Sequence, residues 1–171
     1  MARVLADFPG AKRALFSHFH IGGCQACAYG DEEPLAEVAR RNEISAADMI
    51  GAILKSHEHD KAFLIEPRDL SSQLKDDASS VLLFDTRTRE EFEAVSISGS
   101  RLLTQDLQQE MFATPPTNTL VFIDHTGDRA IDTCSWFSGH GVKDVKALRG
   151  GIDAWAREID PTLQRYRLEI S

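Results

Sequence analysis

The chain has 171 residues, of which 27 are acidic and 19 are basic, so its formal net charge at pH 7 is −8. This charge argues against a nucleic-acid binder, because affinity for phosphate backbones needs clustered lysine and arginine. No apolar run approaches the ~20 residues that cross a bilayer, and the N-terminus lacks the apolar segment of a secretory signal. Three cysteines, an odd number, do not suit a secreted disulfide scaffold. We therefore expect a cytoplasmic protein that binds neither nucleic acid nor membrane.

The first 55 residues show apolar side chains at three- and four-residue spacing, which predicts helices. One helix is expected to follow Pro9-Gly10, a second to follow Pro34, and a third to begin at Ser45. The third helix is predicted to bury Met49, Ile50, Ile53 and Leu54. The sequence therefore predicts a small all-α domain of three helices.

The polar run from Lys55 to Lys61 is typical of a surface linker. It places the domain boundary after residue 57, with a helical domain over residues 1–57 and a second domain over 58–171. A core of about 55 residues is marginal alone, so the helical domain is expected to lean on the second domain or on a partner chain.

After the linker, short apolar runs alternate with helical segments. The runs Val81–Phe84, Leu120–Ile123 and Val145–Leu148 predict buried parallel strands. Helical spacing recurs over 129–139, where Cys134 is expected to be a buried packing residue, and over 152–159. This alternation predicts an α/β domain with a central parallel sheet flanked by helices.

Several motifs occur in a fixed order between residues 62 and 160. They are Ile65–Leu70, Val81–Arg87, Glu90–Phe92, Gly127–Arg129, Gly141–Val145 and Leu148–Trp155. Together they resemble a rhodanese-like domain. Family members that transfer sulfur carry a nucleophilic cysteine at the start of a Cys-x-x-Gly-x-Arg loop, where backbone N–H groups and a helix N-terminus stabilise a thiolate or persulfide.

In this chain the corresponding loop has an acid in the first position. The loop consists of Asp124, His125, Thr126, Gly127, Asp128 and Arg129. Asp124 stands where the resemblance places the cysteine, and a carboxylate cannot accept a sulfane sulfur. The chain is therefore not expected to be an active thiosulfate sulfurtransferase at this loop.

The altered loop has two interpretations. In the first, the Asp124 carboxylate fills the anion-binding loop and is held by its amides and by Arg129, while Asp128 discourages outside anions. In the second, Asp124 and His125 line an open pocket that binds a cation or acts as acid and base. The charges favour the first interpretation. Asp85 and Arg87, which also match family positions, are expected to form a strand-end cap and an ion pair.

Cys24 and Cys27 follow Gly22-Gly23 and form a Cys-x-x-Cys pair, which in a cytosolic chain indicates redox or metal chemistry. Residues 2 to 56, with this pair after a helix and before two more, resemble the small helical redox-disulfide domain found alongside hybrid-cluster proteins. That resemblance implies work with thiol redox, sulfur or nitric oxide, without fixing a reaction.

Three interpretations of Cys24 and Cys27 stay open at this point. The first is reversible dithiol or persulfide chemistry, with no cofactor and with a redox or sulfur-carrier protein as partner. The second is an iron–sulfur or zinc site, whose missing ligands would come from a second chain in a homodimer or from His18 and His20. The third is simple packing. We favour a thiol-redox or sulfur-handling protein with an inactive rhodanese-like docking or regulatory module over a non-enzymatic metal-binding module. The sequence does not decide whether the pair makes the chain an enzyme.

Overall fold

The computed structural model describes residues 1–8, 10–22 and 28–166. The chain consists of two compact units, Met1–Ala62 and Phe63–Ser171. The division therefore follows Ala62, whereas the polar run placed it after residue 57. Among the described residues, no helix is both long and apolar enough to span a membrane.

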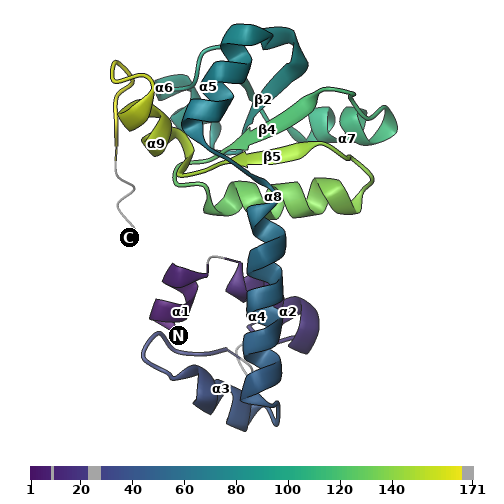
Figure 1. Ribbon diagram of the computed structural model, residues 1–171, viewed down its shortest axis with the longest axis vertical. Coiled ribbons are helices and arrows are strands. Elements are labelled where there is room, and N and C mark those ends of the chain that lie inside the picture. The colour runs from purple at the N-terminus through teal and green to yellow at the C-terminus, as the bar shows by residue number, and fades with distance from the viewer. Residues whose placement is uncertain (9, 23–27, 167–171) are drawn as a thin grey trace. The chain divides into compact units, whose positions relative to one another are not determined.

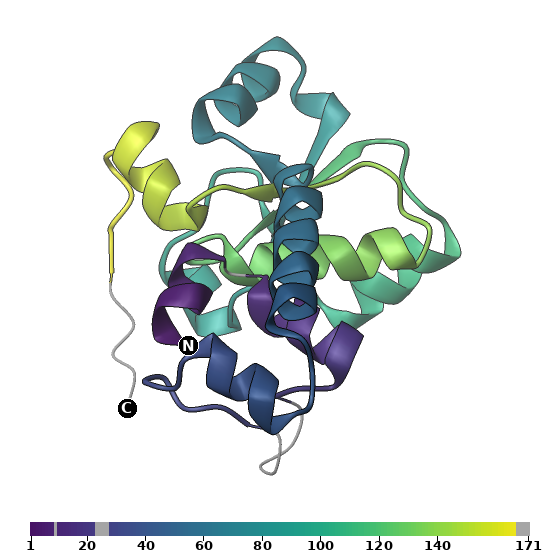
Figure 2. The same ribbon diagram turned by 60° about the horizontal axis from the view of Figure 1, so that its bottom comes forward.

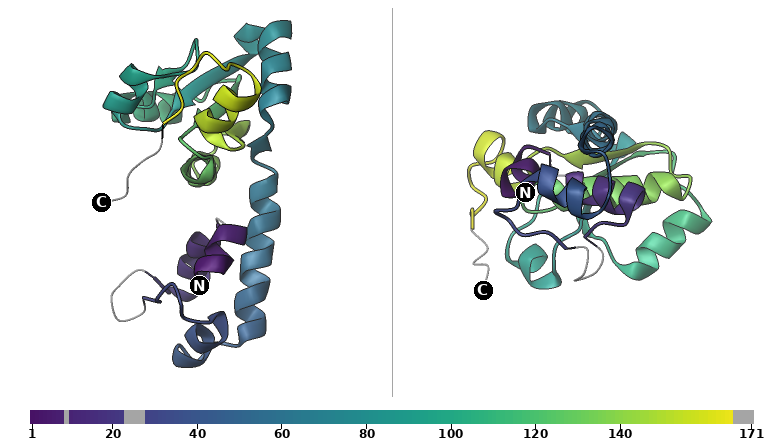
Figure 3. Two further views of the ribbon diagram at one scale, coloured as in Figure 1. Left: turned by 90° about the vertical axis from the view of Figure 1, so that its left-hand side faces the viewer. Right: turned by 90° about the horizontal axis from the view of Figure 1, so that it is seen from below.

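The described part of unit 1 contains helices joined by turns and loops, and no strand. Its helices are α1 (Ala2–Asp7), α2 (Ala11–Phe19), α3 (Leu35–Arg41) and α4 (Ala46–Lys61). Helices α2 and α3 pack against α4, and α1 packs against α2 (Figures 1 and 3). Leu15, Val38 and Met49 are fully buried among these helices. The described part thus has four helices where three were expected, because the six residues of α1 are too few to show a helical period.

The expected linker is helical. Helix α4 continues through the polar run to Lys61. Near its end Asp60 is buried and accepts a hydrogen bond from the Arg13 guanidinium of α2, so the last turns of α4 belong to the packed unit. A charge run can therefore hide a buried ion pair that composition does not reveal.

The buried face of α4 is narrower than predicted. Met49 and Ile53 are buried, but Ile50 and Leu54 are 46% and 47% exposed. Successive residues are about 100° apart around a helix, so side chains one position further along turn away from the core.

Unit 2 contains a parallel sheet in the strand order β1-β5-β4-β2-β3. The strands are β1 (Leu64–Ile65), β2 (Val81–Asp85), β3 (Arg101–Leu102), β4 (Thr119–Ile123) and β5 (Val145–Leu148). The helices are α5 (Pro67–Asp76), α6 (Arg89–Ala94), α7 (Gln105–Ala113), α8 (Asp128–Gly139) and α9 (Gly151–Glu158), with a 3-10 turn at Ala78–Ser80. The predicted fold class and its three longer strands are confirmed.

Both faces of the sheet are covered (Figures 1 and 2), which explains why Val81–Phe84 of β2 and Leu120–Ile123 of β4 are apolar without interruption. Phe84 and Phe122 face the core shared with α7 and α8, where Cys134 is fully buried as predicted. The intervening residues, such as Val121, face the second core under α5 and α9. Because β2 and β4 are parallel neighbours, the segments that follow them emerge at one edge of the sheet.

Candidate functional site

The loop between β4 and α8 holds the six residues that the sequence singled out. Gly127 has φ +99° and immediately precedes α8. A Cβ at this position would lie 2.8 Å from the Gly150 amide nitrogen, so both the backbone conformation and the space require glycine. The loop therefore turns tightly, with the first N–H groups of α8 directed back toward its start.

Asp124 occupies the centre of this turn and is only 4% exposed. Its carboxylate accepts hydrogen bonds from the Gly127 N–H and, at 2.8 Å, from the Arg129 N–H. Burial raises the pKa of Asp124 above its ordinary value, although the hydrogen bonds from Arg129 and Gly127 act in the opposite direction. This is the geometry of the self-capped interpretation, with the Arg129 backbone rather than its guanidinium as donor.

The N-terminus of α9 supports the loop through backbone hydrogen bonds. The Ile152 N–H donates to the Asp124 carbonyl at 2.9 Å, and the Asp153 N–H donates to the His125 carbonyl at 3.2 Å. Gly151 has φ +57°, and a Cβ there would overlap the Asp124 carbonyl oxygen. The motif Leu148–Trp155 is thus the support of the loop.

Asp85 and Arg87 form a buried pair beside the loop. The Asp85 carboxylate accepts from the Arg87 Nε at 2.9 Å and Nη2 at 2.6 Å, and also caps the strand by accepting from the Arg87 N–H. Arg87 Nη2 also donates to the Val95 carbonyl at 2.7 Å. Burial alone would lower the pKa of Arg87, but hydrogen bonds to Asp85 and Tyr166 raise it overall. The predicted cap and ion pair are present, and the pair is buried.

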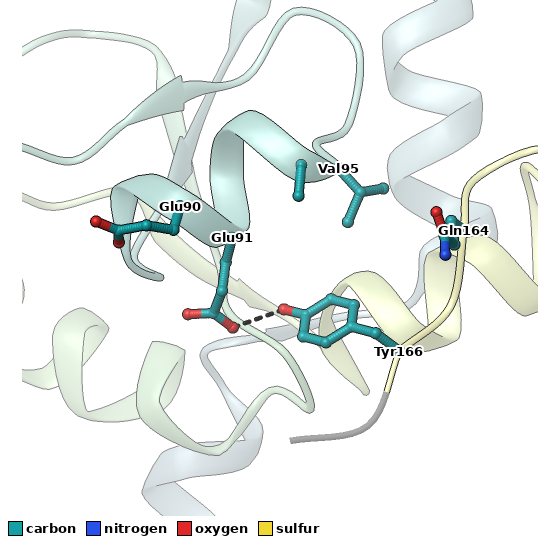
Figure 4. A pocket seen from close by; sticks show the side chains of 6 residues that line it. Glu90, Glu91, Val95, Gln164 and Tyr166 are labelled. Carbon is teal, nitrogen blue, oxygen red and sulfur yellow. Dashed lines mark hydrogen bonds between the residues drawn. The ribbon is translucent and has the colours of Figure 1, made fainter. Parts of the chain in front are cut away.

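Tyr166, near the C-terminus, reaches into this group. Its hydroxyl accepts a hydrogen bond from Arg87 Nη1 at 2.7 Å. It also donates to Glu91 Oε1 at 2.7 Å (Figure 4). Burial opposes ionisation of both acids. Burial raises the pKa of Tyr166, and the hydrogen bond to Glu91 adds to this effect. For Glu91, burial is outweighed by the hydrogen bonds from Tyr166 and Thr88 together with the charge of Arg87, so that the pKa of Glu91 is lowered.

The same segment covers His125. The His125 and Tyr166 rings are stacked, with centroids 4.4 Å apart and planes 6° from parallel. His125 Nε2 lies 3.0 Å from the Tyr166 carbonyl oxygen, and it must carry the proton because a carbonyl only accepts. Next to it, Arg165 donates to both oxygens of Asp153 at 2.7 and 3.1 Å, which lowers the pKa of Asp153.

Two cavities adjoin the Tyr166 ring. One, of about 350 Å³, lies against α6 and is lined by Glu90, Glu91, Ala94, Val95, Gln164 and Tyr166 (Figure 4). The other, of about 390 Å³, is lined by His125, Thr126, Asp153, Arg165 and Tyr166. Tyr166 lines both cavities and is therefore the central residue of the site.

The structure thus brings the predicted loop residues together, with Thr126 Oγ1 donating to Asp128 at 3.2 Å. Sequence reasoning missed Arg165, Tyr166 and the part played by Asp153. Residues 161–166 show no periodic pattern and match none of the motifs, so nothing in the sequence connected them with a loop forty residues earlier.

Cys24 and Cys27 lie outside the described residues. Of their surroundings, Ile21 is buried, and Gly22 has φ +89° with the Tyr29 ring beside its Cα. The Tyr29 hydroxyl is buried and has no hydrogen-bond partner among the described residues, and burial raises the pKa of Tyr29. Both cysteine roles therefore stay predictions.

The histidines suggested as extra ligands lie at the end of α2. His18 Nδ1 is 3.2 Å from the Ala14 carbonyl oxygen, and His20 follows the helix with φ 58°. Within residues 1–8, 10–22 and 28–166, no three histidine, cysteine or acidic side chains gather as metal ligands would. The metal alternative stays a prediction as well, since it depends on the two cysteines.

A model of the rhodanese-like domain matches residues 66–158. The chain belongs to the rhodanese-like family. The match spans α5 to α9 and includes the loop at Asp124 and the supporting glycines. Over 94 residues the chain is 34% identical to a protein named sulfurtransferase from Allochromatium vinosum, covering 54% of this chain and 87% of that protein.

A second relative, from Mycobacterium tuberculosis, is named "Probable adenylyltransferase/sulfurtransferase MoeZ" and is 30% identical over 109 residues. The match covers 62% of this chain but only 28% of that protein. Among solved structures, a Rhodopseudomonas palustris protein of unknown function, described as a possible tyrosine phosphatase, aligns with a TM-score of 0.51. It is 23% identical and covers 58% of this chain and 85% of its own, a likeness of fold alone.

Proposed function

We propose that the chain is a cytoplasmic thiol-redox or sulfur-handling protein that works through Cys24 and Cys27. The rhodanese-like unit acts as a docking or regulatory module and does not itself transfer sulfur. The observation that carries this proposal is the Asp124 carboxylate, which accepts the N–H groups of Gly127 and Arg129 at the first position of the loop. A group already bound there leaves neither a nucleophile nor a vacant anion site.

Two further observations support a role with sulfur. The Allochromatium relative, which is matched over most of its length, is named a sulfurtransferase. The Cys-x-x-Cys segment resembles a redox-disulfide domain. The same chain would then retain one pair of thiols while lacking the nucleophile of the rhodanese loop.

The proposed chemistry balances with a persulfide donor and a dithiol reductant, each carried by a protein partner. One of the two thiolates attacks the outer sulfur of the donor persulfide, which leaves a cysteine persulfide and the donor thiol. The second thiolate attacks the inner sulfur, so that a Cys24–Cys27 disulfide forms and hydrosulfide leaves. The partner dithiol then reduces this disulfide and is itself oxidised to a disulfide.

Thiol titration of the folded chain under anaerobic conditions tests the cysteine pair. We expect two reactive thiols, converted by mild oxidant to one Cys24–Cys27 disulfide that mass spectrometry can locate. Cys134 is the internal control, because it is fully buried and should react only after unfolding. Two unreactive thiols, or a coloured preparation with stoichiometric iron, would contradict the redox proposal, and the latter would favour the metal-binding alternative.

The loop is tested by transfer of sulfur from thiosulfate to cyanide. We expect no turnover by the wild type and measurable turnover by Asp124→Cys, because the amides that hold the carboxylate can also stabilise a thiolate or persulfide. Asp124→Ser, which adds no thiol, is the matched control. Wild-type turnover that persists in a Cys24→Ser/Cys27→Ser variant would show that the interpretation of Asp124 is wrong.

A further inference from the structure

The side chains of Arg165 and Tyr166 contact the rest of unit 2 in the way that a bound peptide contacts its binding site. Each functional group of the two side chains has a matched partner on the family scaffold. The Arg165 guanidinium is bound by both oxygens of Asp153, and the Tyr166 hydroxyl bridges Arg87 and Glu91. Such bidentate and charge-assisted hydrogen bonds are geometrically selective.

The Tyr166 backbone and ring are recognised as well. The His125 imidazole donates to the Tyr166 carbonyl oxygen and stacks on the ring at 4.4 Å. His125 thus contacts both the main chain and the side chain of Tyr166. The adjoining cavities of about 350 and 390 Å³ share the Tyr166 ring as a wall, so withdrawal of the ring would open each toward the other.

The charge at this site also selects a class of ligand. When Arg165 and Tyr166, here called the terminal segment, are set aside, the charged residues that line the cavities are Glu90, Glu91 and Asp153. The nearby Arg87 is already paired with Asp85. An excess of carboxylates attracts basic groups and repels anions. The favoured occupant therefore carries a cation directly beside an aromatic hydroxyl.

We propose that the mouth of the 124–129 loop is a peptide-binding site for an arginine followed by a tyrosine, and that the chain's own Arg165-Tyr166 occupies it as an internal ligand. A partner protein presenting such a basic–aromatic segment binds by displacing the internal one. The inference rests on the proposed docking role of this unit, but it involves neither Cys24 nor Cys27.

Affinity for the amidated, acetylated peptide Thr-Leu-Gln-Arg-Tyr, the sequence of residues 162–166, tests the site by calorimetry. An Arg165→Ala/Tyr166→Ala variant of the full chain should bind this peptide at least ~10-fold more tightly than the wild type, whose tethered segment competes at millimolar effective concentration. Peptides with glutamate for the arginine or alanine for the tyrosine should bind ~10-fold more weakly. Arg157→Ala is the matched control, because it removes another guanidinium near Asp153 and leaves the terminal segment in place.

Three results would overturn the proposal: no binding by the folded double variant at millimolar peptide, equal binding by the wild type, or equal binding of the charge-reversed peptide. If the double variant does not fold, Arg165→Ala alone keeps Tyr166 and should show an intermediate affinity, whereas wild-type affinity in that variant would contradict the site. Peptide binding should be unchanged by Cys24→Ser/Cys27→Ser, so failure here is distinguishable from failure of the redox proposal.

Discussion

Replacing Asp124 by alanine tests whether the carboxylate holds the loop together. The substitution leaves the Gly127 and Arg129 N–H groups without their acceptor. An unsatisfied buried donor costs about 1–3 kcal/mol. The hydrogen bond from the Gly127 N–H is buried, and the one from the Arg129 N–H is partly buried. The cost of leaving both donors unsatisfied therefore lies in the lower half of the sum for two donors. Removing the buried Asp124 carboxylate also removes the cost of burying its charge, which offsets part of the loss. We therefore expect the free energy of unfolding at pH 7 to fall by about 2 kcal/mol.

The pH dependence of this loss has a definite sign. The pKa of Asp124 is raised above its ordinary value of 3.8, so the folded state resists ionisation of this carboxyl. In the wild type, its contribution to stability is greatest below about pH 4 and declines as the pH rises through the raised pKa. The alanine variant lacks this decline. The destabilisation should therefore be largest near pH 4 and smaller at neutral pH.

Urea unfolding followed by tryptophan fluorescence measures this directly, because Trp136 and Trp155 both belong to unit 2. Asp128→Ala is the matched control. It removes a neighbouring acid whose carboxylate accepts a hydrogen bond from Thr126 Oγ1, and it should cost less than about 1 kcal/mol. An Asp124→Ala variant as stable as the wild type would refute the self-capped loop. A deficit that grows with pH would show that the hydrogen bonds from Gly127 and Arg129 outweigh burial in setting the pKa of Asp124.

Three further substitutions probe the surroundings of the loop and the core. Gly151→Ala should lower the free energy of unfolding by about 2–3 kcal/mol, because its Cβ overlaps the Asp124 carbonyl; Gly141→Ala, with similar φ but open space, should cost only about 1 kcal/mol, and equal losses would contradict this. Cys134→Ser should cost about 1–3 kcal/mol in urea unfolding by burying a hydroxyl, and an unchanged midpoint would argue against close packing there. Asp124→Cys/Tyr166→Ala should turn over thiosulfate faster than Asp124→Cys alone, because the Tyr166 ring covers His125 beside the loop; equal rates would show that the ring does not limit access.

The sheet of unit 2 was predictable because its long strands carry a strong local signal. Val81–Phe84 and Leu120–Ile123 are apolar without interruption, and burial of both faces leaves no alternation to confuse with a surface strand. The two-residue strands β1 and β3 carry no such signal, since their pairing depends on neighbours that are distant in sequence. Local pattern therefore defined the centre of the sheet and not its edges.

The candidate site was predictable only where it is local. Asp124, Gly127 and Arg129 lie within six residues, so a motif could show both the loop and the acid at its first position. Tyr166 is joined to His125 by stacking across forty residues, and no periodicity marks either partner. In α4, similarly, the apolar Ile50 suggested burial, although its exposure depends on where the other helices pack.

Groups of this chain occupy both the anion-binding loop, through Asp124, and the mouth of the loop, through Arg165 and Tyr166. This occupancy determines which charges each place can bind. A loop that binds an outside anion needs free N–H groups, but those of Gly127 and Arg129 are bound to the carboxylate of Asp124. An anionic sulfur donor would then find neither a nucleophile nor a counter-charge at this loop. The carboxylates of Glu91 and Asp153, by contrast, are engaged by groups of the terminal segment that another polypeptide can also supply. Under the proposed docking role, the mouth of the loop therefore prefers a basic polypeptide to an anion.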